Sequence, residues 1–379
     1  MAEPTTALPA PSPPIPWRRL VVWFAASRLL IFTLAGLSLQ IVAPGRFHVF
    51  RDNPLDWLIR WDAGWYLDLL RQGYVFDPTR MSNVNFLPFY PWSVKAIAWA
   101  LPSLELAGYL VSNAFAFGAA ALLWRFTAEI TGRTAAAAGA SAFFLFGPVS
   151  FFFSTLYAEA TFLFLAVASL LAARRARWFV AGLLGLAAAL TRSVGLLLVV
   201  ALAVEFLLRY PWRDYLRRLV FWRGLACCAL PGAGMFLYSL YLGWAVSEPN
   251  AYVISQAHGG HGYSYFWDTY VSRHFVGLPA FHQWWYGTAV VVGVLLVLAG
   301  VLLRIPLSLT ALGLAFVFLH LSIKTLDCLP RFWSVVVPFY VTLGEIKARW
   351  PALGEVLLLS SAALLGLATI LFVNGYWMP

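Results

Sequence analysis

Long apolar runs separated by short polar segments fill almost the whole of this chain. Runs of this length predict a polytopic, all-α membrane protein with about eleven transmembrane helices, and they leave no room for a separate soluble domain. We expect the spans at residues 17–42, 104–124, 135–153, 158–173, 178–190, 194–208, 219–246, 285–303, 307–323, 332–346 and 352–373. Residues 1–16, rich in Pro, Ala and Thr, are expected to form a disordered N-terminal tail, and the first apolar run is long enough to act as a signal anchor.

The polar segment 43–103 is predicted to be the first loop and to contain two helices. If residues 55–70 form one helix, Asp62 lies in the middle of an apolar stripe that includes Tyr66, and there a carboxylate is costly to ionise unless it is paired. The alternative is that the helix breaks near Asp62 and this residue caps the next turn. The run 86–101 carries Lys95 and two prolines and is shorter than the ~20 residues of a crossing, so we expect an interfacial or re-entrant helix.

Two spans are too short to cross a membrane upright. Residues 178–190 and 194–208 predict half-depth helices that meet at Thr191-Arg192-Ser193. Non-helical backbone at membrane depth is tolerated only where it lines a cavity or is buried in protein. We therefore expect a cavity that opens to the outer side, with Arg192 in its floor or wall.

Composition supports a membrane protein: 61% of the residues are hydrophobic, 11% are charged and the mean hydropathy is +0.77. Soluble domains average about a quarter charged residues. The net charge of +10 indicates cytoplasmic loops rather than nucleic-acid binding, because Lys and Arg gather on the cytoplasmic side. The three cysteines (Cys227, Cys228 and Cys328) predict no disulfide scaffold.

The basic clusters predict a cytoplasmic N-terminus and an outer C-terminus. They are Arg18/Arg19, Arg125/Arg133, Arg174/Arg175/Arg177, Arg209/Arg213/Arg217/Arg218/Arg223, Arg304 and Lys347/Arg349. This topology places four polar segments on the outer side: the first loop, residues 154–159, the loop 247–284, and residues 324–331. Their convergence predicts an active site on the outer face.

Four motifs, in order, resemble those of a known family. They are Trp61-Asp62-Ala63 with Gly73-Tyr74, Asn85-Phe86-Leu87-Pro88-Phe89-Tyr90-Pro91, Phe152-Phe153-Ser154-Thr155-Leu156-Tyr157-Ala158-Glu159, and Leu190-Thr191-Arg192-Ser193-Val194-Gly195-Leu196. This order is similar to the second GPI mannosyltransferase (PIG-V type) family and its prokaryotic members, within the GT-C class of polyprenyl-phosphate-sugar glycosyltransferases. The resemblance covers about residues 60 to 200, and the C-terminal third matches loosely through Pro330-Arg331-Phe332. Ala158, Ala160 and Val194 depart from the family pattern.

The resemblance implies a GT-C glycosyltransferase fold with a conserved seven-span module, here 17–246, and variable transmembrane helices over 285–379. It also implies that mannose moves, with inversion, from a polyprenyl-phosphate co-substrate to a lipid or glycan acceptor at the extracytoplasmic face. The departing phosphate needs no general acid, so one base and cations suffice. Asp62 is the predicted base, and a partly desolvated carboxylate is a stronger proton acceptor.

The remaining candidate residues fall into two groups. The predicted donor-phosphate residues are Arg192, Arg331, Lys324, His258 and His261, with Arg192 first because its helix is interrupted around it and a guanidinium binds phosphate with a bidentate fork. The residues predicted to orient the acceptor, the donor sugar or a metal are Glu159, Tyr157, Trp61, Trp65, Asp68 and Arg28. Several have a structural alternative: Glu159 as a helix cap acid, Arg192 as a structural ion pair, Arg28 as a snorkelling side chain, the tryptophans as interface-belt residues and His258 and His261 in a solvated loop.

The cofactor, partners and class leave alternatives open. A divalent cation is possible, no metal site is certain, and the expected partners are the lipid bilayer, the donor and the acceptor, with no nucleic acid. A plasma (inner) membrane location is expected, or the endoplasmic reticulum membrane in a eukaryote. The rival classes are a lipid or glycan transporter or flippase, for which internal repeats are expected and none is found, and a GT-C enzyme that uses another polyprenyl-phosphate sugar.

Overall fold

The computed structural model describes residues 13–45, 53–259, 264–265, 268, 279–324 and 326–378. The regular elements within these ranges are helices. Those of the first half are α1 (Trp17–Ile41), η1 (Pro54–Asp56), α2 (Asp62–Gln72), η2 (Asn83–Asn85), α3 (Phe89–Ala98), α4 (Leu104–Thr131), α5 (Thr134–Leu145), η3 (Ser150–Phe153), α6 (Glu159–Arg174) and α7 (Trp178–Ala189). The others are η4 (Ser193–Leu197), α8 (Leu198–Arg209), α9 (Trp212–Tyr215), α10 (Leu219–Ala229), η5 (Leu230–Gly232), α11 (Ala233–Ala245), α12 (Ala251–His258), α15 (Ala280–Leu302), α16 (Leu307–Leu321), α17 (Leu329–Trp333), α18 (Val337–Arg349) and α19 (Pro351–Val373).

Five helices of the described chain are long and apolar enough to cross a membrane. They are Trp17–Ile41, Leu104–Thr131, Leu219–Ala245, Ala280–Leu302 and Pro351–Val373, and the third of these consists of α10, η5 and α11 in succession. Shorter apolar helices accompany them at Thr134–Leu145, Trp178–Ala189 and Leu307–Leu321. The prediction of an all-α integral membrane protein is confirmed, whereas the number of eleven spans stays a prediction.

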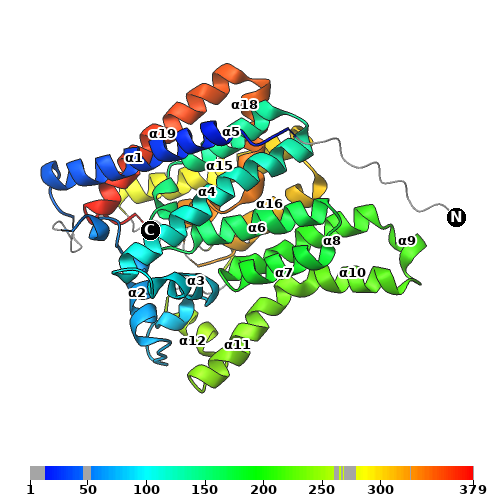
Figure 1. Cartoon of the computed structure of the whole chain (residues 1–379), viewed down its shortest axis with the longest axis horizontal. Coiled ribbons are helices and arrows are strands. Elements are labelled where there is room, and N and C mark those ends of the chain that lie inside the picture. The colour runs from blue at the N-terminus through cyan, green and yellow to red at the C-terminus, as the bar shows by residue number, and fades with distance from the viewer. Residues whose placement is uncertain are drawn as a thin grey trace.

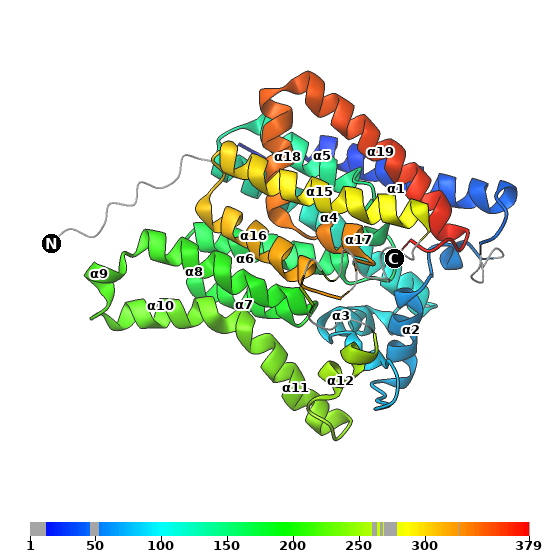
Figure 2. The same cartoon turned by 180° about the vertical axis from the view of Figure 1, so that it is seen from behind.

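The helices form two groups, one around α4, α5, α6 and α18 and the other around α7, α8, α10 and α16, and the groups are joined where α6 packs along α7 (Figures 1 and 2). In the first group, α5 and α18 cross where two glycines meet. A Cβ added to Gly139 would lie 2.9 Å from the Cα of Gly344, so the two backbones touch. Small residues allow this close approach. Within lipid the hydrophobic effect does not drive helices together, so close van der Waals packing of this kind holds them instead.

In the second group, the predicted interruption between two short helices is confirmed. α7 ends at Ala189, Arg192 has an extended backbone (φ −147°, ψ 136°), and the chain resumes as η4 and α8. A Cβ on Gly195 would lie 2.5 Å from the Cα of Ala189. The motif therefore needs glycine at this position, because the chain turns back directly onto the end of α7.

The first loop carries α2 and α3 at one end of the bundle, beside α12 (Figures 1 and 2). The interpretation of residues 55–70 as one helix is wrong: η1 ends at Asp56 and α2 begins at Asp62. Trp61 lies between them with a φ of 45°, a conformation that no residue adopts within a right-handed helix. α3 spans ten residues, too few to cross a membrane, as expected for the run 86–101.

Two expected spans are also divided by local chemistry. The expected 332–346 span is two helices, α17 and α18, and the second starts with Pro338 in its first turn, a position that proline favours. The expected 135–153 span ends as an α-helix at Leu145, shortly before Gly147 and Pro148.

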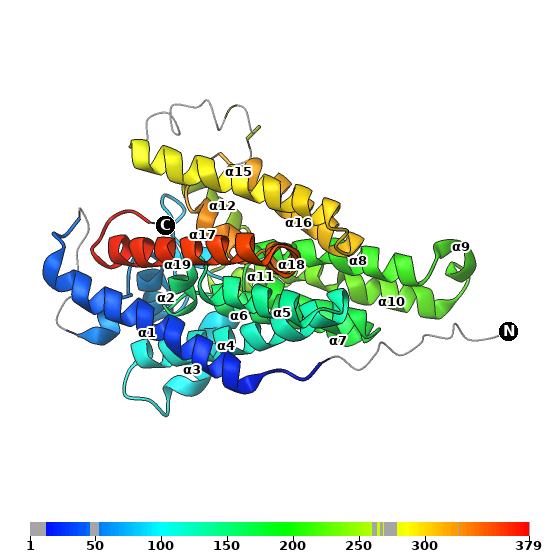
Figure 3. The ribbon, with the colours of Figure 1, turned by 90° about the horizontal axis from the view of Figure 1, so that it is seen from above.

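The C-terminal residues return to the end of α1 (Figure 3). Asn374 donates from Nδ2 to Ser38 Oγ over 2.9 Å, and the Gly45 amide donates to the Asn374 carbonyl over 2.7 Å. The buried Arg60 guanidinium ties the first loop to this end, because it donates to the carbonyl oxygens of Asp56 (3.0 Å), Ile59 (2.7 Å) and Val373 (2.8 Å). Burial lowers the Arg60 pKa to about 10.

Candidate active site

Four charged side chains form a continuous chain of ion pairs, which we call the carboxylate–guanidinium chain. Arg331 Nη2 lies 2.6 Å from Asp62 Oδ2, and Arg331 Nε lies 2.8 Å from Glu159 Oε1. Arg192 Nη1 binds the same Glu159 oxygen. Two carboxylates and two guanidinium groups alternate, so the chain is electrically neutral as a unit.

Each member sits where an element begins or is interrupted. Asp62 is the first residue of α2 and Glu159 is the first residue of α6, and a helix N-terminus stabilises negative charge. Arg331 lies in the short helix α17, and Arg192 lies in the break between α7 and η4. Three of the predicted outer segments and the interrupted helix pair are thus brought together.

The carboxylate–guanidinium chain is open to the surface on the side of Asp62. The Glu159 side chain is fully buried, those of Arg331 and Arg192 are 9% and 13% exposed, and that of Asp62 is 24% exposed. A substrate therefore reaches Asp62 before any other charge of the chain. One oxygen of Glu159, Oε2, is buried without a hydrogen-bond partner in the described part of the structure.

Aromatic rings form the wall around both guanidinium groups. The Arg331 guanidinium carbon lies 4.9 Å from the Tyr157 ring and 5.5 Å from the Phe152 ring. Phe332 lies 5.5 Å from the guanidinium carbons of both Arg331 and Arg192. Tyr157 is held in turn by a 3.0 Å hydrogen bond from its hydroxyl to the Arg60 carbonyl. Such contacts stabilise a desolvated cation and limit its movement.

Two neighbours of the chain were not among the predicted site residues. Tyr66 packs edge-to-face on Phe86 and Tyr90. Burial raises its phenol pKa well above the usual value, and the Glu159 charge raises it further, so the hydroxyl stays protonated. His320 is buried in α16 with its ring 5.3 Å from that of Phe332. Sequence patterning assigned Tyr66 to an apolar stripe; His320 is a polar side chain inside an apolar run, which was the available signal.

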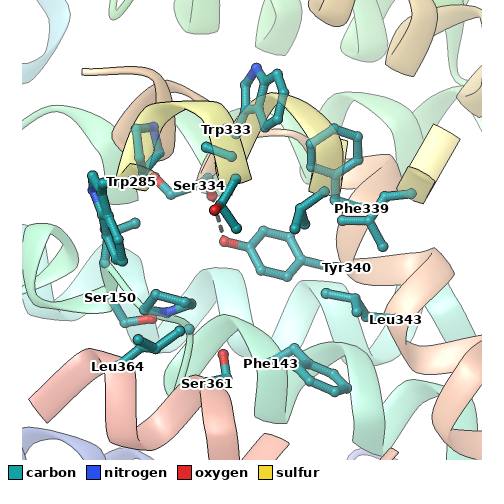
Figure 4. A pocket seen from close by; sticks show the side chains of 18 of the residues that line it. Phe143, Ser150, Trp285, Trp333, Ser334, Phe339, Tyr340, Leu343, Ser361 and Leu364 are labelled. Atoms are coloured by element: carbon teal, nitrogen blue, oxygen red, sulfur yellow. Dashed lines mark hydrogen bonds between the residues drawn. The ribbon is translucent and has the colours of Figure 1, made fainter. Parts of the chain in front are cut away.

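An apolar cavity of about 220 Å³ lies beside α17 (Figure 4). Pro330, Trp333 and Ser334 line it from one face of the α17 segment, while Arg331 faces the carboxylates. Trp285 of α15 and Tyr340 of α18 close other sides, and the Tyr340 hydroxyl donates to the Ser334 carbonyl over 2.5 Å. The same short helix therefore borders both the charge chain and an apolar space.

Three other predicted residues lie in the first loop and make structural contacts. The Trp61 ring packs on Phe372 and Trp377, with ring centroids 4.7 and 5.6 Å apart. Trp65 stacks on Phe86 at 6.2 Å. Asp68 accepts hydrogen bonds from Gln72 (2.6 Å) and Asn83 (3.3 Å). Their predicted roles toward sugar or acceptor stay predictions.

The remaining predicted residues do not join the chain in the described structure. Arg28 donates to Ser154 Oγ over 2.6 Å. Lys324 is exposed, and His258 is exposed at the end of α12, where Nδ1 lies 3.0 Å from the Ile254 carbonyl oxygen. His261 lies outside the described residues.

Metal ligands are sparse around this site. Across the described residues, no three His, Cys, Asp or Glu side chains group together. Both carboxylates of the carboxylate–guanidinium chain are already bound by guanidinium groups. The donor set therefore does not fit a divalent cation, and we derive no step through one.

Comparison with known proteins adds a family and a fold. Residues 34–220 match the mannosyltransferase (PIG-V) family. ArnT from Cupriavidus metallidurans bound to undecaprenyl phosphate is 14% identical with a TM-score of 0.53, over 95% of this chain and 76% of that one. The oligosaccharyltransferase from Archaeoglobus fulgidus in the apo form is 13% identical with a TM-score of 0.51, over 95% of this chain and 56% of that one. No curated protein matches the sequence. The shared architecture is the GT-C fold.

Proposed function

We propose that this chain, whose residues 34–220 match the mannosyltransferase (PIG-V) family, is a membrane glycosyltransferase that transfers mannose from a polyprenyl-phosphate donor to a hydroxyl of a lipid or glycan acceptor. The observation that carries this proposal is the pairing of Asp62 with Arg331, which puts a candidate base and a candidate phosphate ligand 2.6 Å apart. A transferase that uses a sugar phosphodiester needs both groups beside one anomeric carbon.

In the proposed reaction, the acceptor oxygen attacks the anomeric carbon from the side opposite the phosphate. A new carbon–oxygen bond forms as the bond from that carbon to the phosphate oxygen breaks, which inverts the configuration. Asp62 takes the acceptor proton, and the polyprenyl phosphate leaves with the electron pair of the broken bond. Asp62 suits this role because it is the most exposed member of the chain.

Donor binding activates the base in this proposal. Arg331 Nη2 lies 2.6 Å from Asp62 Oδ2, so this carboxylate oxygen is paired with the guanidinium and is not available to an acceptor hydroxyl while the contact lasts. The donor phosphate competes for Arg331 Nη2, because arginine binds phosphate oxygens in a fork. Transfer of this contact from Asp62 to phosphate frees the carboxylate when a donor is present. The enzyme then withholds its base from water until the donor arrives.

Glu159 and Arg192 position Arg331. Glu159 holds Arg331 Nε on one side and Arg192 Nη1 on the other through a single oxygen. Since Arg331 keeps its Glu159 contact when Asp62 is released, its fork stays aimed at the same point. Arg192 then adds a second positive charge for the departing phosphate. The Tyr66 phenol, protonated at neutral pH, supplies an uncharged hydrogen-bond donor near these groups.

The apolar cavity beside α17 suits the start of the donor's isoprenoid chain. One face of this segment presents Pro330 and Trp333 to the cavity, and Arg331 points to the carboxylates. A lipid phosphate with its head at Arg331 thus has an apolar path for its tail. The undecaprenyl phosphate bound to the similarly folded ArnT supports this donor class. Sugar contacts by Trp61, Trp65 and Tyr157 and phosphate contacts by Lys324, His258 and His261 remain part of the proposal.

We place the reaction on the extracytoplasmic face. The helix ends opposite the site carry the clusters of Arg and Lys, and such clusters mark the cytoplasmic side. The first loop and the C-terminal residues then lie outside, with the site beneath them.

The test combines a labelled donor with a matched pair of variants. Membranes that contain the protein receive radiolabelled polyprenyl-phosphate mannose and candidate acceptors, and the product is tested for a new glycosidic bond. Asp62→Asn keeps the side-chain size and is expected to lower the rate by about 10²–10⁴-fold. Asp77→Asn removes one carboxylate from the same loop, where it pairs with Arg80 at 2.8 Å outside the carboxylate–guanidinium chain, and should retain wild-type activity.

Two outcomes contradict the proposal. Full activity in Asp62→Asn removes the base assignment. Movement of label across the membrane without a glycosidic bond replaces the enzyme by a transporter or flippase. A labelled product from a donor with another sugar, and none from mannose, corrects the substrate.

A further inference from the structure

A second cavity, which has a polar lining, lies at the end of the helix bundle opposite the carboxylate–guanidinium chain. Its volume is about 150 Å³, and it is lined by Ile130, Thr131, Arg133, Leu303, Arg304, Ile305, Pro306, Glu345 and Arg349. The α4–α5 turn, the α15–α16 turn and the end of α18 each contribute to it. These helix ends lie on the side where α1 begins, away from α2 and α3 (Figure 2). The cavity is therefore separate from the carboxylate–guanidinium chain.

Positive charge dominates this cavity. Three guanidinium groups and one carboxylate leave a net charge of +2 within the lining. Glu345 is almost fully buried and accepts from Arg133 Nη1 at 3.3 Å and from Arg349 Nε at 3.0 Å. Arg349 also donates to the Leu303 carbonyl over 3.2 Å. One carboxylate thus fixes two of the three cations, and their charge is only half compensated.

Arg304 is the third cation of this cavity. Among the residues that the structure describes, its guanidinium has no hydrogen bond or ion pair. The Arg133 and Arg349 side chains are 49% and 37% exposed, so all three cations are reachable from the surface. Arginines that only neutralised Glu345 and the nearby helix C-termini would not need this third charge or an open cavity between them.

We infer that this cavity binds the phosphate of an anionic membrane lipid. Guanidinium forks match phosphate oxygens, and a basic pocket between helix ends at the cytoplasmic surface fits an anionic headgroup. Apolar side chains Ile130 and Ile305 in the lining favour a lipid over a free ion, because an acyl chain lies beside a phosphate held at the membrane surface. A soluble phosphate ester shares the phosphate chemistry and is the alternative source.

The experiment measures lipid binding by the whole protein in nanodiscs. Discs of phosphatidylcholine alone are compared with discs that also contain phosphatidylglycerol, and retained phosphatidylglycerol is counted by native mass spectrometry. Arg304→Gln should weaken the affinity for phosphatidylglycerol about tenfold, and Arg304→Lys should keep most of it. The control is Arg217→Gln, which removes one exposed positive charge from the basic segment between α9 and α10, outside the cavity, and should have no effect.

Three results overturn the inference. Equal losses in Arg304→Gln and Arg217→Gln indicate general attraction to an anionic surface. Unchanged affinity in the double variant Arg133→Gln/Arg304→Gln removes the cavity as the site. Binding of glycerol phosphate in phosphatidylcholine discs, as tight as that of the lipid, assigns the cavity to a soluble ester. If Arg304→Gln does not fold, Arg133→Gln alone carries the test, and mannosyl transfer in phosphatidylcholine discs reports folding.

Discussion

Arg331 and Arg28 are each 8% exposed as whole residues and each lies over an aromatic ring, yet their polar partners differ. Arg331 contacts Asp62 and Glu159, and its guanidinium lies over the rings of three aromatic residues. Arg28 donates to the hydroxyls of Ser154 and Ser27, and within the described chain no carboxylate pairs with it. One buried cation is compensated by charge and the other by neutral dipoles.

We expect this difference to separate an arginine that takes part in the reaction from one that is structural. A guanidinium held by carboxylates can exchange one of them for another anion, such as a phosphate, without leaving a buried charge unpaired. Arg28 has no anion to exchange. The hydroxyl of Ser154, its main partner, donates a hydrogen bond to Asn113 Oδ1 over 3.0 Å, so Arg28 joins α1 to α4 through the turn before α6. We therefore expect substitution of Arg331 to change catalysis and substitution of Arg28 to change stability.

The largest effect is expected at the centre of the carboxylate–guanidinium chain. Glu159→Gln leaves two buried guanidinium groups with Asp62 as their remaining carboxylate. Removing one partner of a buried ion pair costs about 3–5 kcal/mol, and thermal or denaturant unfolding in detergent measures this loss. The double variant Glu159→Gln/Arg192→Gln should recover part of it, because it removes one of the uncompensated charges.

Glu105→Gln is the matched control for this prediction. Glu105 pairs with the exposed Arg71 at 2.7 Å, and a surface pair of this kind contributes about 0–1 kcal/mol. A similarly small loss in Glu159→Gln would mean that the chain is screened by water, and the contrast with Arg28 would then disappear.

Much of the fold was predictable, because a membrane span is a local property. The apolar runs placed α1, α6, α7 and α19 within a residue of their ends. The break at Arg192 followed from helix length alone. The sequence leaves the break before Asp62 as one of two alternatives, because the apolar stripe continues through residues 55–70 and hides the turn at Trp61, where φ is 45°.

The sequence names all four members of the carboxylate–guanidinium chain, and the pair between Arg192 and Glu159 is the structural ion pair that it offers as an alternative for Arg192. The pair between Asp62 and Arg331 could not be predicted, because it joins segments that are distant in the sequence. Periodicity shows which face of a helix is apolar and does not show which helices meet. For the same reason Tyr66 was assigned to an apolar face, although its pKa responds to the Glu159 charge.

The second largest effect is expected on the kinetic constants, at Arg331, which in the proposed reaction exchanges its contact with Asp62 for one with the donor phosphate. Arg331→Lys keeps the positive charge but replaces a fork with a single ammonium, which cannot reach Asp62, Glu159 and a phosphate in the same geometry. We expect the donor KM to rise and kcat to fall, with kcat/KM lower by about 10–100-fold. Initial rates against donor concentration measure both constants.

Arg71→Lys makes the same replacement in the exposed pair with Glu105 and should leave both constants unchanged. A drop in kcat at constant donor KM in Arg331→Lys would indicate that Arg331 acts on Asp62 alone. The donor phosphate would then have to be bound elsewhere, at Arg192 or Lys324.

The smallest effect is expected at Arg28. Arg28→Lys keeps a buried positive charge and loses the fork that joins Ser27 and Ser154, so the free energy of unfolding should fall by roughly 1 kcal/mol. The donor KM should stay at the wild-type value, because Arg28 does not contact the carboxylate–guanidinium chain. Arg19→Lys, at a guanidinium stacked over Trp23 at 4.2 Å, is the control for replacing an arginine within α1. If Arg28→Lys raises the donor KM as far as Arg331→Lys does, Arg28 belongs to the donor site, and a buried cation without a carboxylate partner would then be the stronger indication of where the phosphate binds.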